Sequence, residues 1–276
     1  MKILNNTGEK NYRTKKKYGQ NFLENKVILE EIFSYADINK TDTVIEIGPG
    51  LGFLTESLAE KARQVYAFEI DDDLVKILSE KFSKVENLKI IHTDFMDYDL
   101  SEIVEKEKNI KVVANIPYYI TSPIVGKLIK YRDSIDEIYI MVQKEVAERI
   151  SAVSPSSDIS LLTHAVQFFG NAEYLFTVKK ELFNPVPKVD SAFLGIKLYK
   201  DREYEKQIDE AEYFKYLKAA FSNKRKSLGN NMKNLGYDKQ QTGSALEKTG
   251  KKPLARAEEF SVQEFIDFIN ALKDEK

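Results

Sequence analysis

The chain has 276 residues, of which 42% are hydrophobic and 31% are charged, and its formal net charge is -2. Because it has no cysteine and only two histidines, the sequence excludes disulfides, thiolate zinc sites and cysteine nucleophiles, and we predict no metal site. No apolar run approaches the roughly 20 residues of a membrane span, and the polar N-terminus lacks the apolar core of a secretion signal, so we expect a cytoplasmic protein.

Positive charge is concentrated in two short segments, although the chain as a whole is almost neutral. The candidates for contacts with a nucleic-acid backbone are Arg13, Lys15, Lys16 and Lys17 near the N-terminus and Lys224, Arg225 and Lys226 further along. Clustered lysine and arginine are what phosphate groups would meet. The alternative is that each cluster is only a solvated tail or helix end.

A helical pattern starts near Val27, shortly after the sequence GQNFL at 19–23. Asn21 and Leu23 lie where the chain enters this first packed helix. Their ordinary interpretation is that Asn21 caps the helix and Leu23 joins the core. The residues alone therefore assign them no binding role.

A strand, a glycine turn and a helix follow one another from residue 43. We predict a buried strand over 43–47, a turn through the glycines of 48–52 and a helix over 53–62. This order marks the ligand-binding first unit of a doubly wound sheet, because glycines permit a tight turn and close approach of the backbone to a ligand. The turn is therefore the expected ligand site.

Acidic residues stand at the ends of the next two predicted strands. The second strand ends in Glu69, roughly 20 residues past the first glycine, where the hydroxyls of a ribose would be bound. Between the strands, Asp71 and Asp72 are predicted to cap a helix. The third strand, over 88–92, is followed by Asp94, which is either a ligand contact or an ordinary turn or cap residue.

Charge favours one of the two cofactors that fit this pattern. A nicotinamide dinucleotide brings a pyrophosphate, which favours helix dipoles and backbone N–H groups, whereas S-adenosylmethionine carries a sulfonium and an ammonium and no phosphate. Glu46, Glu69 and Asp94 form an acidic rim that better matches the cationic ligand. The glycines also have G-x-G-x-G spacing rather than the full dinucleotide fingerprint, so we favour S-adenosylmethionine, with Glu69 on its ribose and Asp94 near its adenine amine.

The fourth predicted strand, 111–115, delivers the sequence NIPY to the same edge of the sheet. The exocyclic amine of adenine is a poor nucleophile because its lone pair is delocalised into the ring. We predict that the Asn115 side-chain oxygen accepts one amine hydrogen, that the backbone carbonyl of Pro117 accepts the other, and that Tyr118 stacks on the base. Methyl transfer to such an amine needs no cysteine, unlike transfer to a pyrimidine ring carbon. The alternative is a strand-ending turn with packed aromatic residues.

The remaining elements complete an α/β architecture with a helical C-terminal part. A strand over 137–143 and a helix over 144–150 precede a closing pair of strands at 172–178 and 191–198. In the loop between that pair, Phe183 is a candidate for the other face of the base pocket or an anchor in the core. After residue 200 the composition becomes polar and charged, and helical patterns dominate.

With its motifs in this order, the chain resembles the KsgA family of ribosomal RNA adenine dimethyltransferases over nearly its whole length. The matching stretches are GQNFL at Gly19, EIGPGLG at Glu46, the acidic Glu69 and Asp94, NIPYYIT at Asn115, MVQKEVAERI at Met141, FNPVPKVDSA at Phe183, AFSNKRKSLGNN at Ala220 and ARAEEFSVQEF at Ala255. The resemblance implies a Rossmann-like class I methyltransferase sheet with a small C-terminal all-α domain. The expected parts are a basic arm at 1–20, an S-adenosylmethionine-binding domain at 21–200 and a helical RNA-recognition domain at 201–276.

The resemblance also implies an activity and the residues that carry it. The reaction would be two successive N6 methylations of each of two adjacent adenosines in the 3'-terminal hairpin loop of small-subunit (16S) ribosomal RNA. The substrate would be a 30S assembly intermediate, and we expect a monomer. The implied cofactor residues are Asn21, Leu23, Gly48, Glu69, Asp94 and Asn115. The implied base-pocket residues are Asn115, Pro117, Tyr118 and Phe183.

One loop departs from the family, which usually has a Tyr-Gly pair where this chain reads Ser157, Asp158, Ile159, Ser160. The difference bears on loop contacts with RNA and leaves the chemistry alone. Three other functions stay open. They are the related Erm group, which methylates large-subunit RNA, a mainly non-catalytic ribosome assembly factor, and a nicotinamide oxidoreductase, which would leave NIPY unexplained.

Overall fold

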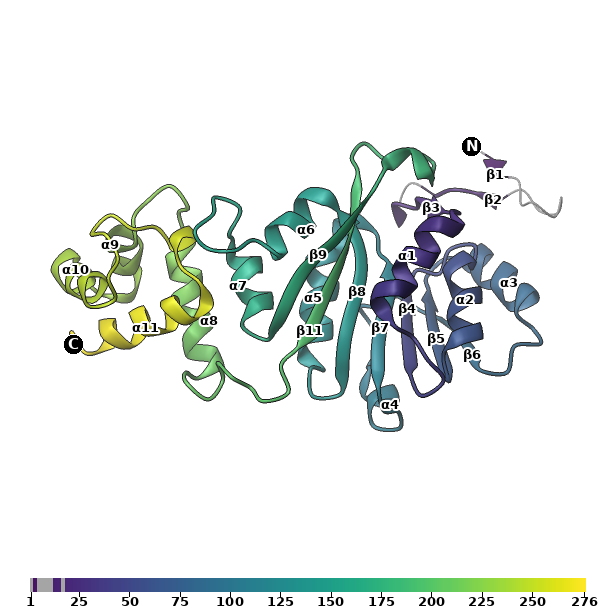
Figure 1. Ribbon diagram of the computed structural model, residues 1–276, viewed down its shortest axis with the longest axis horizontal. Coiled ribbons are helices and arrows are strands. Elements are labelled where there is room, and N and C mark those ends of the chain that lie inside the picture. The colour runs from purple at the N-terminus through teal and green to yellow at the C-terminus, as the bar shows by residue number, and fades with distance from the viewer. Residues whose placement is uncertain (1, 4–11, 16–17) are drawn as a thin grey trace. The chain divides into compact units, whose positions relative to one another are not determined.

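The structure of the chain is a computed structural model that describes residues 2–3, 12–15 and 18–276 (Figure 1). The chain divides into two compact units. The first contains residues 1–147 and 173–198, and the second contains residues 148–172 and 199–276. None of the helices in the described part of the chain combines the length and the apolar character needed to cross a membrane.

The first unit is built on the main sheet, which has seven strands within the described residues, in the order β6-β5-β4-β7-β8-β11-β9. The strands are β4 (Thr43–Ile47), β5 (Gln64–Glu69), β6 (Leu88–His92), β7 (Ile110–Asn115), β8 (Ile135–Gln143), β9 (Gly170–Val178) and β11 (Ser191–Leu198). Strands β4 to β8 pair in parallel, and β11 runs antiparallel to β8. The strand order reverses at β4, which has β5 on one side and β7 on the other. Sheets of this kind bind ligands outside the carboxyl ends of the strands at that point.

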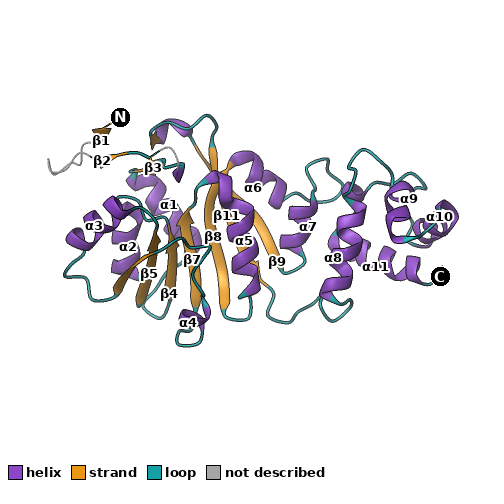
Figure 2. Ribbon diagram, turned by 180° about the vertical axis from the view of Figure 1, so that it is seen from behind, coloured by secondary structure: helices purple, strands orange, loops and turns teal. Residues whose placement is uncertain are grey.

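Helices cover both faces of this sheet. On the face toward the viewer in Figure 1 lie α1 (Lys26–Ala36), α2 (Phe53–Lys61) and α3 (Asp72–Lys81). On the opposite face, seen from behind in Figure 2, lies α5 (Thr121–Lys130). The connections also include the short α4 (Ser101–Val104) and α6 (Lys144–Ile150). Because a parallel sheet is covered on both sides, β4 is buried along its whole length, including its one acidic residue.

Local sequence signals placed most of these elements correctly. The predicted strands at 43–47 and 88–92 are confirmed, and the Asp71 side chain caps α3 by accepting from the N–H of Asp73. Asp72 is instead the first residue of that helix. The interpretation of Asn21 as a helix cap is wrong, because the side chain of Asn25 caps α1.

Short strands also tie the N-terminal segment to the rest of the first unit. β3 (Phe22–Leu23) pairs antiparallel with β10 (Phe183–Asn184), which follows the 3-10 turn η3 (Lys180–Leu182). Nearer the N-terminus, the backbones of β1 (Lys2–Ile3) and β2 (Tyr12–Arg13) pair antiparallel. These two-residue strands are too short to show a periodicity in sequence, so the sequence pattern does not predict them.

The second unit is helical and has an aromatic core. Its elements are α7 (Leu161–Gln167), α8 (Glu210–Ala220), α9 (Leu228–Asn231), η4 (Met232–Leu235), α10 (Lys239–Lys248), η5 (Ala257–Glu259) and α11 (Val262–Lys273). Phe168 stacks on Tyr213 with ring centroids 4.3 Å apart, and His164 Nδ1 lies 2.8 Å from the Tyr213 hydroxyl. Because these side chains after α6 pack on α8, residues 148–172 belong to this unit, which is larger than the expected span of 201–276.

Replacing Gly52 with alanine should destabilise the first unit. Gly52 has a φ of 78°, and a Cβ there would lie 2.6 Å from Phe82 and 2.9 Å from Leu78. The expected loss in the free energy of unfolding is about 1–3 kcal/mol, measured by urea unfolding followed by circular dichroism. The matched control is Gly126→Ala on α5, where no atom lies within 4 Å and a gain of up to about 1 kcal/mol is expected. Equal effects of the two substitutions would contradict the packing described for the glycine turn.

Candidate active site

A cleft of about 200 Å³ opens in the first unit at the carboxyl ends of β4, β5 and β7. Its walls come mainly from residues 18–25, 46–54, 68–70, 93–96 and 114–120. Eight of the predicted site residues line it, namely Asn21, Leu23, Gly48, Glu69, Asp94, Asn115, Pro117 and Tyr118. The structure therefore brings the residues predicted for the cofactor and most of those predicted for the base into one crevice.

The glycine turn forms the floor of the cleft. Gly48 and Gly50 have φ angles of 70° and 60°, which residues with a side chain rarely adopt. The Gly48 N–H donates to the carbonyl of Phe68 at 2.9 Å, which ties the turn to β5. A Cβ on Gly50 would lie 2.7 Å from the ring of Phe22. Glycine is therefore required for the turn to fit between β5 and the N-terminal segment.

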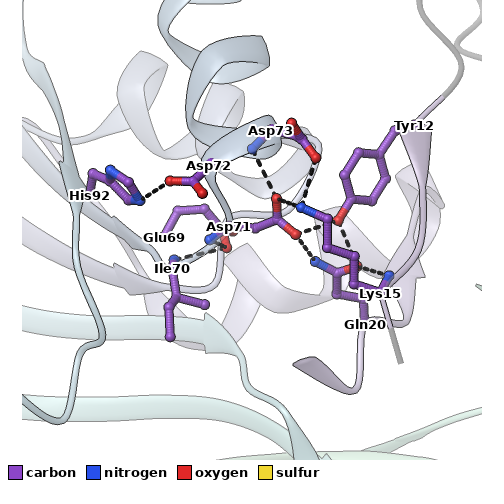
Figure 3. A network of polar contacts seen from close by, with 9 residues as sticks. All are labelled: Tyr12, Lys15, Gln20, Glu69, Ile70, Asp71, Asp72, Asp73 and His92. Carbon is purple, nitrogen blue, oxygen red and sulfur yellow. Dashed lines mark hydrogen bonds and ion pairs between the residues drawn. The ribbon is translucent and has the colours of Figure 1, made fainter. Parts of the chain in front are cut away.

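Glu69 ends β5 as a buried carboxylate, and only 5% of the residue is exposed. Its Oε1 accepts from the N–H groups of Ile70 and Asp71, both at 3.0 Å (Figure 3). Its Oε2 accepts from the N–H of Gly50 at 3.3 Å. Burial raises the pKa of Glu69, and these backbone donors oppose the rise. The carboxylate is thus held in place by backbone N–H groups, and its remaining lone pairs suit the hydroxyls of a ribose.

Asp94 lies in a loop that a lysine on α5 holds in place. Asp94 Oδ1 accepts from the N–H of Met96 at 2.8 Å, so the turn interpretation is confirmed. The residue also lines the cleft, and its contact with a ligand stays a prediction. The Lys127 ammonium donates to the carbonyls of Phe95 at 2.6 Å and Met96 at 2.9 Å, and also to that of Tyr98. Sequence reasoning missed Lys127, because its partners are backbone carbonyls that no side-chain pattern reveals.

Two asparagines connect β7 to the N-terminal segment. The Asn115 amide nitrogen donates to the carbonyl of Asn21 at 3.1 Å, and the Asn21 amide nitrogen donates to the carbonyl of Gly19 at 3.1 Å. The first contact orients the Asn115 amide and leaves its oxygen to accept a hydrogen bond in the cleft.

The turn after β7 carries the predicted stacking residue. Tyr118 begins the 3-10 turn η2 (Tyr118–Ile120), is half-buried, and has its hydroxyl 2.6 Å from Ser191 Oγ. Burial raises the pKa of this hydroxyl, which therefore stays neutral. Anchored at its far end, the ring forms a wall of the cleft next to Pro117.

Phe183 is not itself among the residues that line the cleft, although it neighbours some of them. It is 2% exposed and belongs to the hydrophobic core with Val178 and Phe193, and in the β3–β10 pair it stands opposite Leu23. Of the two interpretations given for this residue, the anchor in the core describes its position in this structure. Its contact with a base remains a prediction.

Glu46 contributes a buried carboxyl group to the cleft wall. The residue is 1% exposed, and its Oε2 has no hydrogen-bond partner among the described residues. Burial raises the pKa of Glu46 to about 8, and the charge of nearby Glu69 adds to the rise. An unpartnered carboxyl oxygen at this position suits a ligand that brings a positive charge or a hydrogen-bond donor.

Of the basic residues predicted near the N-terminus to contact RNA, only Lys15 has a described side chain. Lys16 and Lys17 lie outside the described residues, and so does the side chain of Arg13, whose backbone belongs to β2. Lys15 is paired with Asp71 and Asp73.

The second basic cluster lies in the helical unit. Lys224 donates to the carbonyl of Ser157 and lies 3.9 Å from the carboxylate of Glu258. All three residues of the cluster are exposed, and Arg225 and Lys226 are the two chosen below as candidates for contacts with RNA.

The fold and the cleft define a class I methyltransferase, and comparison with known proteins identifies its family. Residues 11–274 match the family model of ribosomal RNA adenine dimethylase, so the chain belongs to that family. Ribosomal RNA small subunit methyltransferase A of Fusobacterium nucleatum is 49% identical over 259 residues, which are 94% of this chain and 97% of that protein. The protein of the same name from Clostridium botulinum is 41% identical over 266 residues, which are 95% of each chain.

Two solved structures share this fold over most of the chain. A dimethyladenosine transferase from Plasmodium falciparum has a TM-score of 0.75 at 26% identity, covering 92% of this chain and 98% of that one. The 23S rRNA methyltransferase ErmE has a TM-score of 0.73 at 26% identity, covering 92% of this chain and 100% of that one. Both solved structures resemble this chain to a similar degree, and both are less identical to it than the small-subunit methyltransferases are.

The buried Glu46 should make the stability of the ligand-free protein depend on pH. Between the ordinary pKa of 4.5 and the raised value of about 8, the folded protein holds a proton that the unfolded chain has released. The free energy of unfolding should therefore fall as the pH rises through this interval. Glu46→Gln lacks this dependence, so its melting temperature relative to the wild type should increase from about pH 5 to about pH 8. If the difference in melting temperature between Glu46→Gln and the wild type stayed constant with pH, Glu46 would already be ionised in the folded protein.

Proposed function

We propose that this chain transfers methyl groups from S-adenosylmethionine to the N6 amines of two adjacent adenosines in the 3'-terminal hairpin loop of small-subunit ribosomal RNA, two to each. The observation that carries the proposal is that one cleft joins the acidic residues Glu69 and Asp94 to the turn from Asn115 to Tyr118. Family membership supports adenosine as the target, and the 49% identity to a small-subunit methyltransferase supports the choice of RNA.

The residues of the cleft fit a cationic nucleoside cofactor. Glu69 would accept hydrogen bonds from the ribose hydroxyls, and Asp94 would accept one from the adenine amine. Its raised pKa leaves Glu46 mostly protonated in the ligand-free protein, and a bound cation would favour the ionised form of this carboxyl group. When bound, S-adenosylmethionine supplies a methyl group activated by its sulfonium.

The target amine would be held by acceptors at the end of β7. The Asn115 side-chain oxygen would accept one amine hydrogen, because the contact of the amide nitrogen with the carbonyl of Asn21 fixes the orientation of the amide. For the second hydrogen the predicted acceptor is the carbonyl of Pro117, which already accepts from the N–H of Ile120 at 3.3 Å. A carbonyl oxygen has two lone pairs, so this contact leaves one of them for the amine. Tyr118 would stack on the base, so the amine attacks from a fixed position.

Dimethylation places a further demand on the cleft. The adenosine must be unstacked or flipped to enter. After the first transfer its nitrogen keeps one hydrogen, so it must rotate and use a single acceptor while the new methyl group occupies free space. The base is therefore held by its ring and by one hydrogen bond in the second step.

The biological setting forms part of the same proposal. The substrate is a 30S assembly intermediate rather than free RNA, and the chain acts as a monomer in the cytoplasm. The exposed Arg225 and Lys226 of the helical unit meet the RNA backbone, together with Arg13, Lys16 and Lys17 of the N-terminal arm.

The substitution Asn115→Ala should lower turnover by about a hundredfold or more, since it removes the acceptor that positions the amine. Methyl transfer to small subunits is the measurement, and a thermal melt checks the fold. Asn270→Ala, at an exposed position on α11, is the matched control and should keep full activity. Near-normal rates in the Asn115 variant would remove the role assigned to it.

Replacing both Arg225 and Lys226 with alanine should weaken RNA binding and make it less dependent on salt. The slope of log K against log salt should fall by about 0.7–0.9 for each phosphate group that the variant no longer neutralises. Lys206 and Lys239, two exposed lysines of the same unit, form the control pair when both are replaced by alanine. If the slope falls equally in both double variants, the cluster has no special role in binding RNA.

Radiolabelled methyl transfer to immature small subunits, large subunits and naked RNA tests the function as a whole. N6,N6-dimethyladenosine in small-subunit RNA alone is the expected product. Label only in large-subunit RNA would assign the chain to the Erm reaction. Binding to small subunits without any label would instead indicate an assembly factor.

A further inference from the structure

The buried carboxylate of Asp71 forms hydrogen bonds and an ion pair with side chains of the N-terminal segment (Figure 3). Its side chain is 0% exposed and lies 2.6 Å from the Lys15 ammonium and 2.8 Å from the Tyr12 hydroxyl. Gln20 Nε2 also donates to it at 3.3 Å. These four side chains, Tyr12, Lys15, Gln20 and Asp71, are called the arm latch below.

The arm latch also contains contacts that organise the N-terminal segment itself. The Lys15 N–H donates to Gln20 Oε1 at 2.8 Å, and Lys15 forms a second ion pair with Asp73 at 2.7 Å. The ring of Tyr12 packs against the edge of Phe22, with ring centroids 5.8 Å apart. The segment is therefore fastened by charge at Lys15 and by apolar contact at Tyr12.

The arm latch is connected to the cofactor cleft at two places, through Asp71 and through Gln20. On one side, the N–H of Asp71 donates to Glu69 Oε1 at 3.0 Å, so the latch carboxylate and the ribose-binding carboxylate belong to one turn. On the other side, Gln20 is followed by Asn21 and Phe22, which line the cleft. A change in the arm latch therefore moves two walls of the cleft.

The ion pair with Asp71 argues against Lys15 also binding an RNA phosphate. A buried carboxylate is stable only when it is paired, and removing its partner leaves an uncompensated charge. The hydrogen bonds from Lys15 and Tyr12 lower the pKa of Asp71 although burial opposes them, so this carboxylate is ionised at neutral pH. If Lys15 moved away to neutralise a phosphate, it would leave the buried carboxylate of Asp71 without its ion pair, which is unfavourable.

We propose that Lys15 and Tyr12 are positioning residues for the cofactor, which hold the N-terminal segment against the Glu69 turn so that docking of the segment and binding of S-adenosylmethionine stabilise each other. The proposal rests on the proposed function, because it takes S-adenosylmethionine as the ligand. It assigns Lys15 an internal partner in place of the RNA contact expected from sequence. Because such coupling is reciprocal, the cofactor should in turn fasten the segment.

Titration of the full chain with S-adenosylmethionine in the absence of RNA tests the coupling. Lys15→Met should weaken binding on the order of tenfold. Lys15→Arg should restore it, because a guanidinium can pair with both Asp71 and Asp73. Lys26→Met, which removes an exposed lysine at the start of α1, is the matched control and should bind like the wild type. Unchanged affinity in Lys15→Met would overturn the proposal.

The salt dependence of RNA binding separates the two roles of Lys15. The probe is the naked 3'-terminal hairpin of small-subunit RNA. The slope of log K against log salt should be the same for Lys15→Met and the wild type if Lys15 acts through Asp71. A slope reduced by about 0.7–0.9 would return Lys15 to the phosphate contacts and overturn the proposal.

Hydrogen exchange without any ligand tests the arm latch independently of the cofactor. In Lys15→Met the backbone N–H groups of Gly50, Ile70 and Asp71, which hold Glu69, should exchange faster than in the wild type. Unchanged exchange would overturn the proposal even if the variant binds the cofactor poorly. A wild-type chain that does not bind S-adenosylmethionine would refute the proposed function, and the exchange experiment would still decide whether the latch exists.

Discussion

A buried anion at the end of β5 sets the geometry of the whole site. The carboxylate of Glu69 is costly to bury, and it is held because backbone N–H groups of Gly50, Ile70 and Asp71 donate to it. Those groups belong to the glycine turn after β4 and to the start of α3. One charge therefore fixes the relative positions of β4, β5 and α3, and the cleft forms where these elements meet.

The central part of the fold was predictable because its signals are local. Buried strands appear as apolar runs between turn residues, so the limits of β4, β5 and β6 followed from the sequence. Since parallel strands end at one edge of a sheet, the meeting of Glu69, Asp94 and Asn115 in one cleft also followed from chain order. The particular RNA did not follow from these signals, and it depends on resemblance across the whole chain.

Contacts between distant segments were not predictable in the same way. Lys127 and Lys15 are ordinary lysines in sequence, and only the folded chain brings them to backbone carbonyls and to Asp71. A cluster of basic residues near the N-terminus suggests RNA for all its members, although one of them is paired internally. Similarly, the sequence offers no reason why residues 148–172 should join the helical unit, because that choice depends on aromatic packing between α7 and α8.

The contact between Asn115 and the carbonyl of Asn21 fixes the orientation of the Asn115 carboxamide, which the position of β7 alone does not determine. A carboxamide has almost the same shape after a half-turn about its last bond, but the turn exchanges an acceptor for a donor. In the orientation fixed by Asn21, the group can offer its oxygen as an acceptor, and in the reversed orientation it would offer N–H donors at the same place. The proposed role of Asn115 therefore depends on one hydrogen bond to the N-terminal segment, and losing that bond would leave the backbone of the sheet unchanged.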